Sequence, residues 1–238
     1  MQIHLQRALI ACNFITGFPE DVEQPHDYTA VLPYFVVPAA LLALLSLVIF
    51  GISLATLEKV PAALLGSLVI GAMWAMVSRG QNLAAFGDLA VVVREQVSLR
   101  RPGGLPREAI RQIALLAALL LKISFLAVLV YYKQWHAFIL VPLCTVLYSV
   151  EMSIHLGYFS RSHELFASCR FLGLLAFFIV SCLAGFRGLF TLGLIWLLCF
   201  SLGAWANSRF PERRHELING GAEGAELVAL LFCVVFIH

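Results

Sequence analysis

Long runs of apolar residues, separated by short or polar connections, dominate this chain of 238 residues. A membrane-spanning helix needs about 20 mostly apolar residues, because each residue rises ~1.5 Å and the hydrocarbon core is ~30 Å thick. Runs of this kind predict spans at 33–56, 60–78, 112–132, 136–158, 166–185, 188–207 and 221–237. The pattern therefore predicts an all-α fold, a polytopic membrane helix bundle of about seven transmembrane helices that forms a single domain over 1–238.

Polar segments of unequal length join these predicted spans. The connections at 57–59, 133–135 and 186–187 are short, and those at 79–111, 159–165 and 208–220 are longer. Because short and long connections alternate, the long ones share one side of the membrane with the N-terminal segment 1–32. We expect the stretch 79–111 to form a polar loop on that side.

Composition agrees with a membrane protein and limits its partners. Apolar residues make up 61% of the chain and charged residues 13%, against about 45–50% and about 25% in soluble proteins. The lipid bilayer is therefore its expected surrounding. A formal net charge of +2, without a long basic run, argues against a nucleic-acid partner. The six cysteines stand singly, mostly in apolar stretches, where we expect them to pack as small hydrophobes. Homo-oligomer formation stays open.

Basic residues fall mainly on the side of the long connections. Cytoplasmic loops collect Lys and Arg, so these residues orient the chain. That side carries Arg7, Arg79, Arg94, Arg100, Arg101, Arg107, Arg111, Arg161, Arg170, Arg209, Arg213 and Arg214, and the other carries Lys59, Lys133 and Arg187. We therefore expect a multi-pass inner-membrane protein with a cytoplasmic N-terminus. Nearly all acidic residues share that side, which indicates either solvated loops or a polar site at the cytoplasmic face.

Ionisable residues occur inside two of the predicted spans. Lys122 lies within LLLKISFLAVL, where an ionised side chain costs at least ~2.5–3.5 kcal/mol. Its partner is either an anionic group in a cavity or Glu151 of the next span. Glu151 and His155 are four residues apart and share a helix face. They form either a site that binds or relays a proton or a plain polar contact.

The stretch 79–111 combines glycines, from Gly80 to Gly104, with a cluster of arginines. Glycine permits close backbone approach, and the forked guanidinium groups of Arg101 and Arg107 suit phosphate oxygens. The stretch predicts a phosphate-facing surface or, equally, a surface that contacts anionic lipid headgroups. It lacks the G-x-x-x-x-G-K-[ST] spacing of a nucleotide-binding P-loop.

Glu223 and Glu226 stand three residues apart at the expected opening of the last span. Carboxylates near a helix N-terminus are stabilised by the helix dipole. Carboxylates beside a cavity can also hold Mg²⁺, which prefers oxygen ligands. The sequence leaves both interpretations open.

Several short motifs follow one another along the chain. FITGFP at 14–19 precedes the first span, Lys122 lies in a leucine-rich span, Pro142 and Tyr158 follow, and Glu223 with Glu226 forms E-x-x-E. In this order and spacing the chain resembles the cobalamin 5′-phosphate synthase family, also called adenosylcobinamide-GDP ribazoletransferase, over nearly its whole length. The resemblance implies a membrane transferase that joins a ribazole-type alcohol to adenosylcobinamide-GDP, a corrinoid nucleotide, and releases GMP late in cobalamin biosynthesis.

The resemblance and the motifs together imply roles for individual residues. Mg²⁺ is the expected cofactor, with Asp88 and Glu216 as its expected ligands. The expected catalytic residues are Asp88, Lys122, Glu223 and Glu226, and the expected substrate-binding residues are Gly80, Asn82, Arg101 and Arg107.

The most specific motif of that family, G-x-H-x-D-G-x-x-D-x-x-D-G, is reduced in this chain. Asp88 is present, but Ala84 and Val91 replace the other two aspartates and Asn82 replaces the histidine. The family's G-R is replaced by Thr145-Val146, and its C-terminal G-D by His215-Glu216. Losing one electrostatic stabiliser commonly slows a reaction ~10²- to 10³-fold.

Three functions therefore stay open from the sequence. The leading hypothesis is an active transferase of this type. The second is a catalytically degenerate relative that binds a corrinoid or a partner protein without turnover. The third is a small membrane transporter that uses Lys122, Glu151 and His155 as relay groups.

Overall fold

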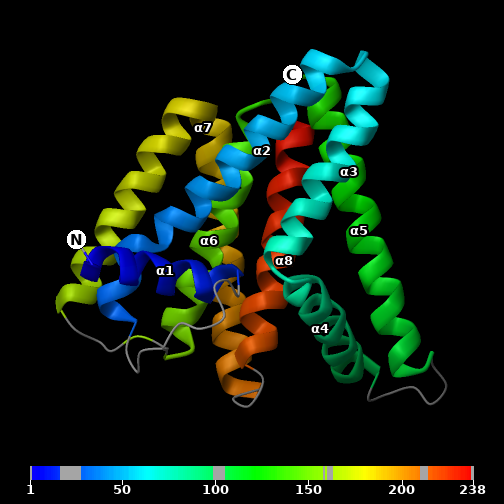
Figure 1. Cartoon of the computed structure of the whole chain (residues 1–238). Coiled ribbons are helices and arrows are strands. Elements are labelled where there is room, and N and C mark those ends of the chain that lie inside the picture. The colour runs from blue at the N-terminus through cyan, green and yellow to red at the C-terminus, as the bar shows by residue number, and fades with distance from the viewer. Residues whose placement is uncertain are drawn as a thin grey trace.

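Helices account for every secondary-structure element that the structure describes (Figure 1). The computed structural model describes residues 2–16, 28–98, 105–157, 159, 163–209 and 214–236. Its elements are α1 (Gln2–Thr16), η1 (Thr29–Phe35), α2 (Val36–Thr56), α3 (Lys59–Val77), α4 (Gln81–Ser98), α5 (Arg107–Tyr131), α6 (Ala137–His155), α7 (His163–Arg209) and α8 (Arg214–Val235). The predicted all-α fold is confirmed.

Helix α7 consists of two arms that reverse direction at Gly185, as Figure 1 shows. Gly185 has φ 54° and ψ −142°, a conformation that glycine adopts at little steric cost. The arms carry apolar helices at Phe171–Leu183 and Gly185–Leu198. These lie where the sequence predicts spans at 166–185 and 188–207, with the reversal within two residues of the predicted turn.

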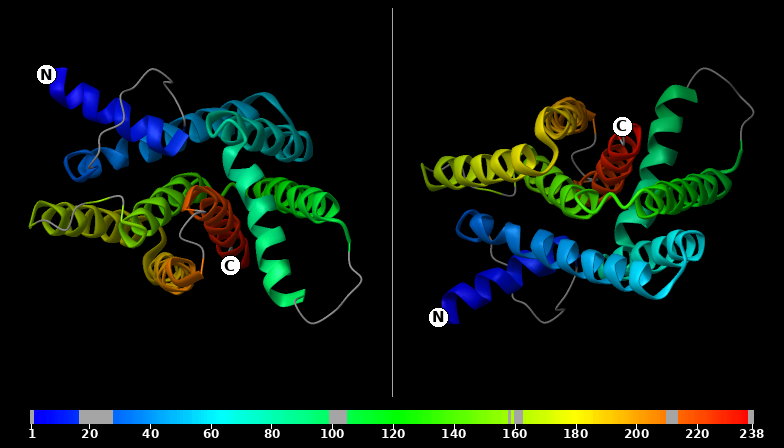
Figure 2. Two further views of the ribbon diagram at one scale, coloured as in Figure 1. Left: turned by 90° about the horizontal axis from the view of Figure 1, so that it is seen from below. Right: turned by 90° about the horizontal axis from the view of Figure 1, so that it is seen from above.

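The bundle has two different ends. Its short-turn end contains the tight connections at Leu57, at Tyr132 to His136 and at Gly185. At the other end, termed the α4 end, α4 lies across the bundle beside α8 (Figures 1 and 2). Helix α1 also lies crosswise at the α4 end, against η1 and α2. The two ends thus present different chemistry to whatever surrounds them.

The prediction that 79–111 forms a polar loop is wrong for most of that stretch. Residues 81–98 form α4, and α5 already begins at Arg107. Ala85 and Val92, two helical turns apart, are both buried, and α4 packs against α8 and α5. The mostly small, apolar face of α4 therefore gains tertiary contacts that favour a helix, which the charge-based interpretation overlooked.

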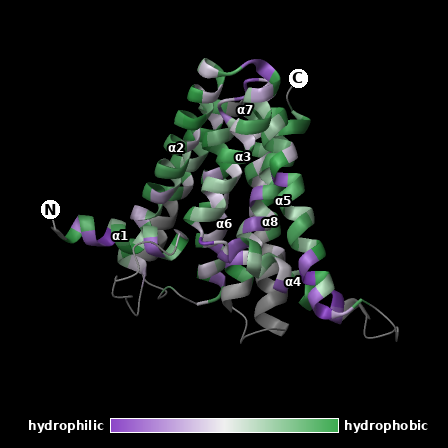
Figure 3. Cartoon of the chain, turned by 45° about the vertical axis from the view of Figure 1, so that its right-hand side comes forward, coloured by the Kyte–Doolittle hydropathy of each residue, from purple (hydrophilic) through white to green (hydrophobic). Residues whose placement is uncertain are grey.

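Five helices are long and apolar enough to cross a membrane: Thr29–Thr56, Lys59–Val77, Arg107–Tyr131, Ala137–His155 and Leu217–Val235. Large apolar side chains point outward from them, such as Leu44 at 59%, Leu65 at 51% and Leu120 at 65% exposure. Hydrophilic residues gather toward the two ends, and the helices between them are mostly hydrophobic (Figure 3). Soluble proteins rarely leave such large apolar surfaces uncovered. The fold is therefore compatible with the predicted membrane bundle, with five long apolar helices and the two shorter helices of α7.

Helix α6 lies at the centre of the bundle and is the most buried of the five candidate spans. It packs against α2, α7 and α8. Helix α8 in turn contacts α4, α5, α6 and α7. Because α8 has four neighbours, polar groups on it can be held away from lipid, and the candidate site lies there.

Candidate functional site

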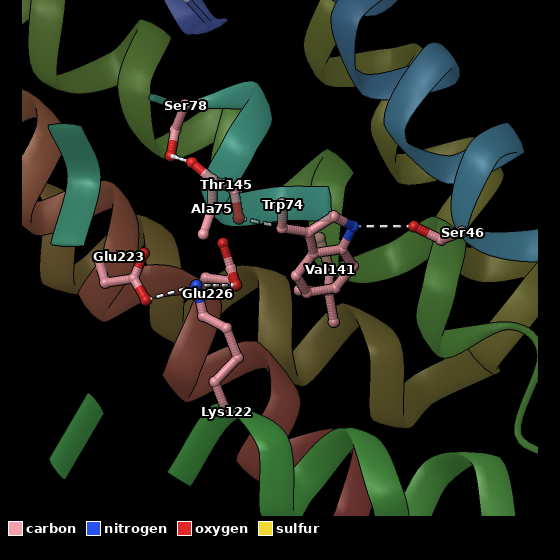
Figure 4. Close-up of polar contacts among 9 residues, drawn as sticks. All are labelled: Ser46, Trp74, Ala75, Ser78, Lys122, Val141, Thr145, Glu223 and Glu226. Atoms are coloured by element: carbon pink, nitrogen blue, oxygen red, sulfur yellow. Dashed lines mark hydrogen bonds and ion pairs between the residues drawn. The ribbon is translucent and has the colours of Figure 1, made fainter. Parts of the chain in front are cut away.

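A buried cluster of charges joins α5 to α8. The ammonium Nζ of Lys122 lies 2.5 Å from Oε1 of Glu223 and 2.7 Å from Oε1 of Glu226. The three residues, termed the ion triad, are 1%, 1% and 6% exposed, and Figure 4 shows the lysine reaching both carboxylates. One cation therefore serves two carboxylates in a region shielded from bulk solvent.

The ion triad decides two questions that the sequence left open. The partners of Lys122 are Glu223 and Glu226, so the interpretation that it pairs with Glu151 is wrong. Glu223 and Glu226 are also not at a helix opening, because α8 begins at Arg214 and stabilisation by the helix dipole fades beyond the first turn. Their stabilisation comes from Lys122.

Glycines on α8 allow its neighbours to come close enough to enclose the ion triad. A Cβ atom at Gly220 would lie 2.6 Å from the carbonyl oxygen of Ala85 on α4, and one at Gly221 would collide with the Tyr148 hydroxyl of α6. That hydroxyl donates a 3.3 Å hydrogen bond to the carbonyl oxygen of Leu217. Because these two residues have no side chain, the backbone of α8 lies directly against Ala85 of α4 on one side and Tyr148 of α6 on the other.

A small cavity of about 30 Å³ lies next to the ion triad. We term it the α4-end cavity, and its lining residues are Ile15, Thr16, Leu42, Trp74, Val77, Ser78, Asn82, Val141, Pro142, Thr145, Val146 and Glu226. A volume of this size matches about one molecule of liquid water. The cavity can therefore take one functional group of a ligand, but not a whole cofactor-sized molecule.

Positions from several of the motifs compared with that family meet at the α4-end cavity. Thr16 comes from FITGFP, Pro142 from the central segment and Glu226 from E-x-x-E, where the chain resembles the family, whereas Asn82 and Thr145 stand where it departs from the family. These positions are up to 210 residues apart in the sequence. Of the expected substrate-binding and catalytic residues, the fold brings Asn82 and Glu226 together here.

The hydroxyl groups that line this cavity present their lone pairs to it. Thr145 Oγ1 donates to the carbonyl oxygen of Val141 at 3.0 Å, and Ser78 Oγ donates to that of Ala75 at 3.2 Å. Figure 4 shows both side chains on the side of Glu226 that faces away from Lys122. With their protons used by the backbone, these groups add acceptors to a carboxylate. Asn82 of the lining can donate or accept, but the carboxylate and the two hydroxyls suit a hydrogen-bond donor, such as a hydroxyl or an amide N–H, and the carboxylate disfavours phosphate.

A neighbouring buried contact stabilises the wall of the α4-end cavity. Trp74 Nε1 donates a 2.8 Å hydrogen bond to Ser46 Oγ, which itself donates to the carbonyl oxygen of Leu42 at 2.7 Å. Trp74 and Leu42 both line the cavity. The indole N–H is thus satisfied, and its ring is fixed between α2 and α3.

The remaining expected site residues lie on the surface of the α4 end. Asp88 Oδ1 is 3.1 Å from Arg111 Nε, and Glu95 Oε1 is 2.5 Å from Arg107 Nε. The Asp88 and Arg107 side chains are 39% and 79% exposed. Gly80 forms the turn between α3 and α4 with φ 68°, and its positive φ accounts for the glycine.

Two expected residues are not placed by the structure. Arg101 lies outside the described residues. Glu216 lies in the first turn of α8, and its side chain is also outside the described part. Gly87, which the sequence places in a phosphate-facing loop, instead packs against α5, with Arg111 Cγ 2.9 Å from its ideal Cβ position.

The described donor groups do not fit a divalent cation. Among the residues that the structure describes, no three His, Cys, Asp or Glu side chains gather as a metal site would require. Asp88 faces Arg111, and Glu223 and Glu226 face Lys122, so each carboxylate already has a cation. Mg²⁺ stays a prediction from the resemblance, and these contacts give it no support.

Glu151 and His155 belong to a different place. His155 Nε2 lies 3.7 Å from Glu151 Oε1, which confirms that they share a face of α6. Glu151 lines an apolar groove of about 440 Å³ between α6 and the arms of α7. Lys122 pairs with Glu223 and Glu226 on α8, whereas Glu151 and His155 lie together on α6. Lys122 is therefore not in contact with the other two residues of the expected relay.

Sequence reasoning missed the residues that shape the site. Gly220, Gly221 and Tyr148 determine how closely α8 is packed, and Thr145 supplies an acceptor although it was considered only as a replaced glycine. One signal was present, since Gly220 and Gly224 have the G-x-x-x-G spacing typical of close helix packing in membranes. Tyr148 has no such signal, because its contact depends on the tertiary fold.

Comparison of the chain with known protein families, curated proteins and solved structures finds no match. Its function must therefore be argued from the site.

Proposed function

We propose that this chain is a membrane protein that binds a corrinoid at the α4 end without catalysing nucleotide transfer. It would be a relative of the cobalamin 5′-phosphate synthase type that binds the corrinoid and lacks the metal centre. The observation that carries the proposal is the meeting of Thr16, Pro142 and Glu226, from three motifs that resemble the family, at one cavity. These residues are up to 210 positions apart in the sequence, so their meeting is a property of the tertiary fold.

The chemistry of the cavity supports a ligand with neutral donor groups. Corrinoids carry amide side chains, and an amide N–H can donate to Glu226 or to the lone pairs of Thr145 and Ser78. With a cavity of about 30 Å³, only one such group enters. The rest of the ligand lies along the α4 end, where Arg79 is exposed and can approach a phosphate.

The expected topology supports access to this site from the cytoplasm. Arg7, Arg94, Arg107 and Arg111 lie on helices of the α4 end, and Arg79 lies in the turn before α4; basic residues mark the cytoplasmic side. We therefore place the α4 end at the cytoplasmic face of the inner membrane. A soluble corrinoid would then reach the cavity without crossing the bilayer.

The test is equilibrium binding of cobinamide derivatives to the purified chain, followed by their visible absorbance. Thr145→Val removes an acceptor and keeps the shape, and it should weaken binding about tenfold, because a net hydrogen bond is worth about 1 kcal/mol or slightly more. Thr56→Val is the matched control. Thr56 also donates to the carbonyl four residues before it, at 2.8 Å, but is exposed on α2. Equal weakening by both variants, or no binding by wild type, would contradict the proposal.

An active transferase is the second candidate, and one observation favours it. The Asp88 carboxylate is 39% exposed, and an exposed ion pair is worth about 0–1 kcal/mol, so Asp88 can exchange Arg111 for another cation. A nucleotide-loop assembly assay with adenosylcobinamide-GDP and a ribazole-type alcohol separates the candidates. Product formed by wild type and lost in Asp88→Ala supports the transferase. Binding without product supports the first proposal.

A further inference from the structure

A second polar cavity opens at the short-turn end, opposite the α4 end. Its volume is about 370 Å³, and it lies between α6, α7 and α8. The residues that line it are Gln134, His136, Leu140, Leu183, Arg187, Gly188, Thr191, Phe232, Cys233 and Phe236. This volume is in the range of small-ligand sites, about 300–1,000 Å³.

The lining of this cavity has the chemistry of an anion site. Arg187 supplies a guanidinium with five N–H donors, and its Nη1 donates a 2.9 Å hydrogen bond to the carbonyl oxygen of Phe236. Gln134 and His136 add an amide and an imidazole, and among the residues that the structure describes the lining includes no carboxylate. The cavity therefore carries a positive charge and donors that no acidic residue of the lining neutralises.

The position of Arg187 is held by its surroundings. Its guanidinium lies over the ring of Phe236, with Cζ 5.9 Å from the ring centroid, and its own carbonyl accepts a 3.0 Å hydrogen bond from Thr191 Oγ1. Burial lowers the pKa of His136 below its usual value, so at neutral pH the imidazole is uncharged. Arg187 is then the charged group of this lining.

Exposed aromatic residues lie at the short-turn end of the bundle, where this cavity opens. Trp135, Tyr132 and Phe186 are 49%, 51% and 82% exposed at the same end of the bundle. Trp and Tyr are enriched where the hydrocarbon core meets the headgroups. A phosphate group at that depth would face Arg187, whose fork can bind two phosphate oxygens.

We infer that this cavity binds the phosphate of an anionic phospholipid headgroup, with Arg187 as the main contact. The site is separate from the α4-end cavity and stands whether or not the chain binds a corrinoid. It would hold a lipid of the leaflet opposite the α4 end. Such a lipid would contact α6, α7 and α8 at the short-turn end, where the connections between helices are short.

The experiment is native mass spectrometry of the full chain with phosphatidylglycerol, with diacylglycerol of the same acyl chains, and with inorganic phosphate as competitor. Wild type should retain phosphatidylglycerol and not diacylglycerol. Arg187→Gln should lower retention about tenfold, as expected for loss of a charge-assisted hydrogen bond. Lys133→Gln is the control, because Lys133 is an exposed cation at the same end that does not line the cavity.

Each alternative gives a distinct result. Equal losses in Arg187→Gln and Lys133→Gln would mean general surface attraction and would overturn the inference. Equal retention of diacylglycerol would mean that the headgroup phosphate does not contribute to binding. Displacement of the lipid by millimolar phosphate would mean that the cavity binds free phosphate. Either result would overturn the inference. If Arg187→Gln does not fold, Gln134→Leu tests the same cavity, and unchanged retention there would also count against it.

Discussion

The ion triad and the ion pairs of α4 both pair a basic side chain with carboxylates, but in opposite surroundings. Lys122 and Glu223 are 2.5 Å apart with side chains 2% exposed. Arg107 and Glu95 are also 2.5 Å apart, but their side chains are 79% and 38% exposed. Equal distances therefore do not mean equal energies, because solvent screens the second pair and is excluded from the first.

The difference determines what each region can do. Removing one partner of a buried pair leaves an uncompensated charge and costs about 3–5 kcal/mol, whereas an exposed pair is worth about 0–1 kcal/mol. Folding stability therefore depends on all three residues of the ion triad keeping their contacts. The α4 pairs can open to a ligand, so the α4 surface is where charged groups remain available for binding.

Loss of the Lys122 ammonium is expected to have the largest effect. Lys122→Met leaves two buried carboxylates without a cation and should lower the free energy of unfolding by about 3–5 kcal/mol. Thermal unfolding of the purified chain in detergent, followed by tryptophan fluorescence, measures the change. The control is the triple variant Lys122→Met, Glu223→Gln and Glu226→Gln, which should recover much of the loss. A wild-type Tm for Lys122→Met alone would show that the triad is not coupled to folding.

Helix packing, more than charge, should hold α4 to the bundle. Gly220→Ala places a Cβ 2.6 Å from a backbone carbonyl oxygen of α4 and should cost about 1–3 kcal/mol, near the upper end, because backbone atoms yield little. Gly224→Ala is the matched control on the same helix, since its Cβ would meet Phe86 at an ordinary 3.7 Å. Both gain equal helix propensity. The Tm of each variant is measured, and equal values would remove the close contact as an explanation.

Periodicity and length were sufficient to predict most of the fold. The runs around Leu44 and Leu65 are so apolar that only helices satisfy their backbone groups in lipid, and the turn at Gly185 falls beside the short polar break in the sequence. The helix at 81–98 was not predictable in the same way. Its charged residues, such as Asp88 and Glu95, give a sequence pattern typical of a solvated loop. Only the packing of Ala85 against α8 shows that the segment has a buried face.

The candidate site was predicted in its residue types but not in its pairings. Lys122 was correctly expected to need a partner, because an isolated charge in a span is costly. The partner could not be chosen from sequence, since Glu151 is nearer along the chain than Glu223. The choice depends on α5 packing against α8, and this contact between distant helices is visible only in three dimensions.

Loss of a buried hydrogen bond between neutral groups should have an effect on stability between those of the buried ion triad and the exposed ion pairs. Ser46→Ala leaves the Trp74 indole N–H without its 2.8 Å acceptor and should cost about 1–2 kcal/mol, the penalty of an unsatisfied buried donor. Ser124→Ala, at an exposed position of α5, is the control for the change in side chain. Thermal unfolding compares them. If both variants shift the Tm equally, the indole has found another acceptor, and the contact is not structural.

The smallest effect is expected at the exposed pair of Asp88 and Arg111. Asp88→Asn keeps the size of the side chain and removes its charge, so the free energy of unfolding should fall by less than about 1 kcal/mol. Because the Debye length falls from ~10 Å at 0.1 M to ~3 Å at 1 M ionic strength, even this difference should shrink as salt is raised toward 1 M. The measurement is Tm at low and high salt for wild type and variant. A loss as large as that of Lys122→Met, and insensitive to salt, would mean that α4 shields Asp88 from water, and the contrast between the two regions would no longer hold.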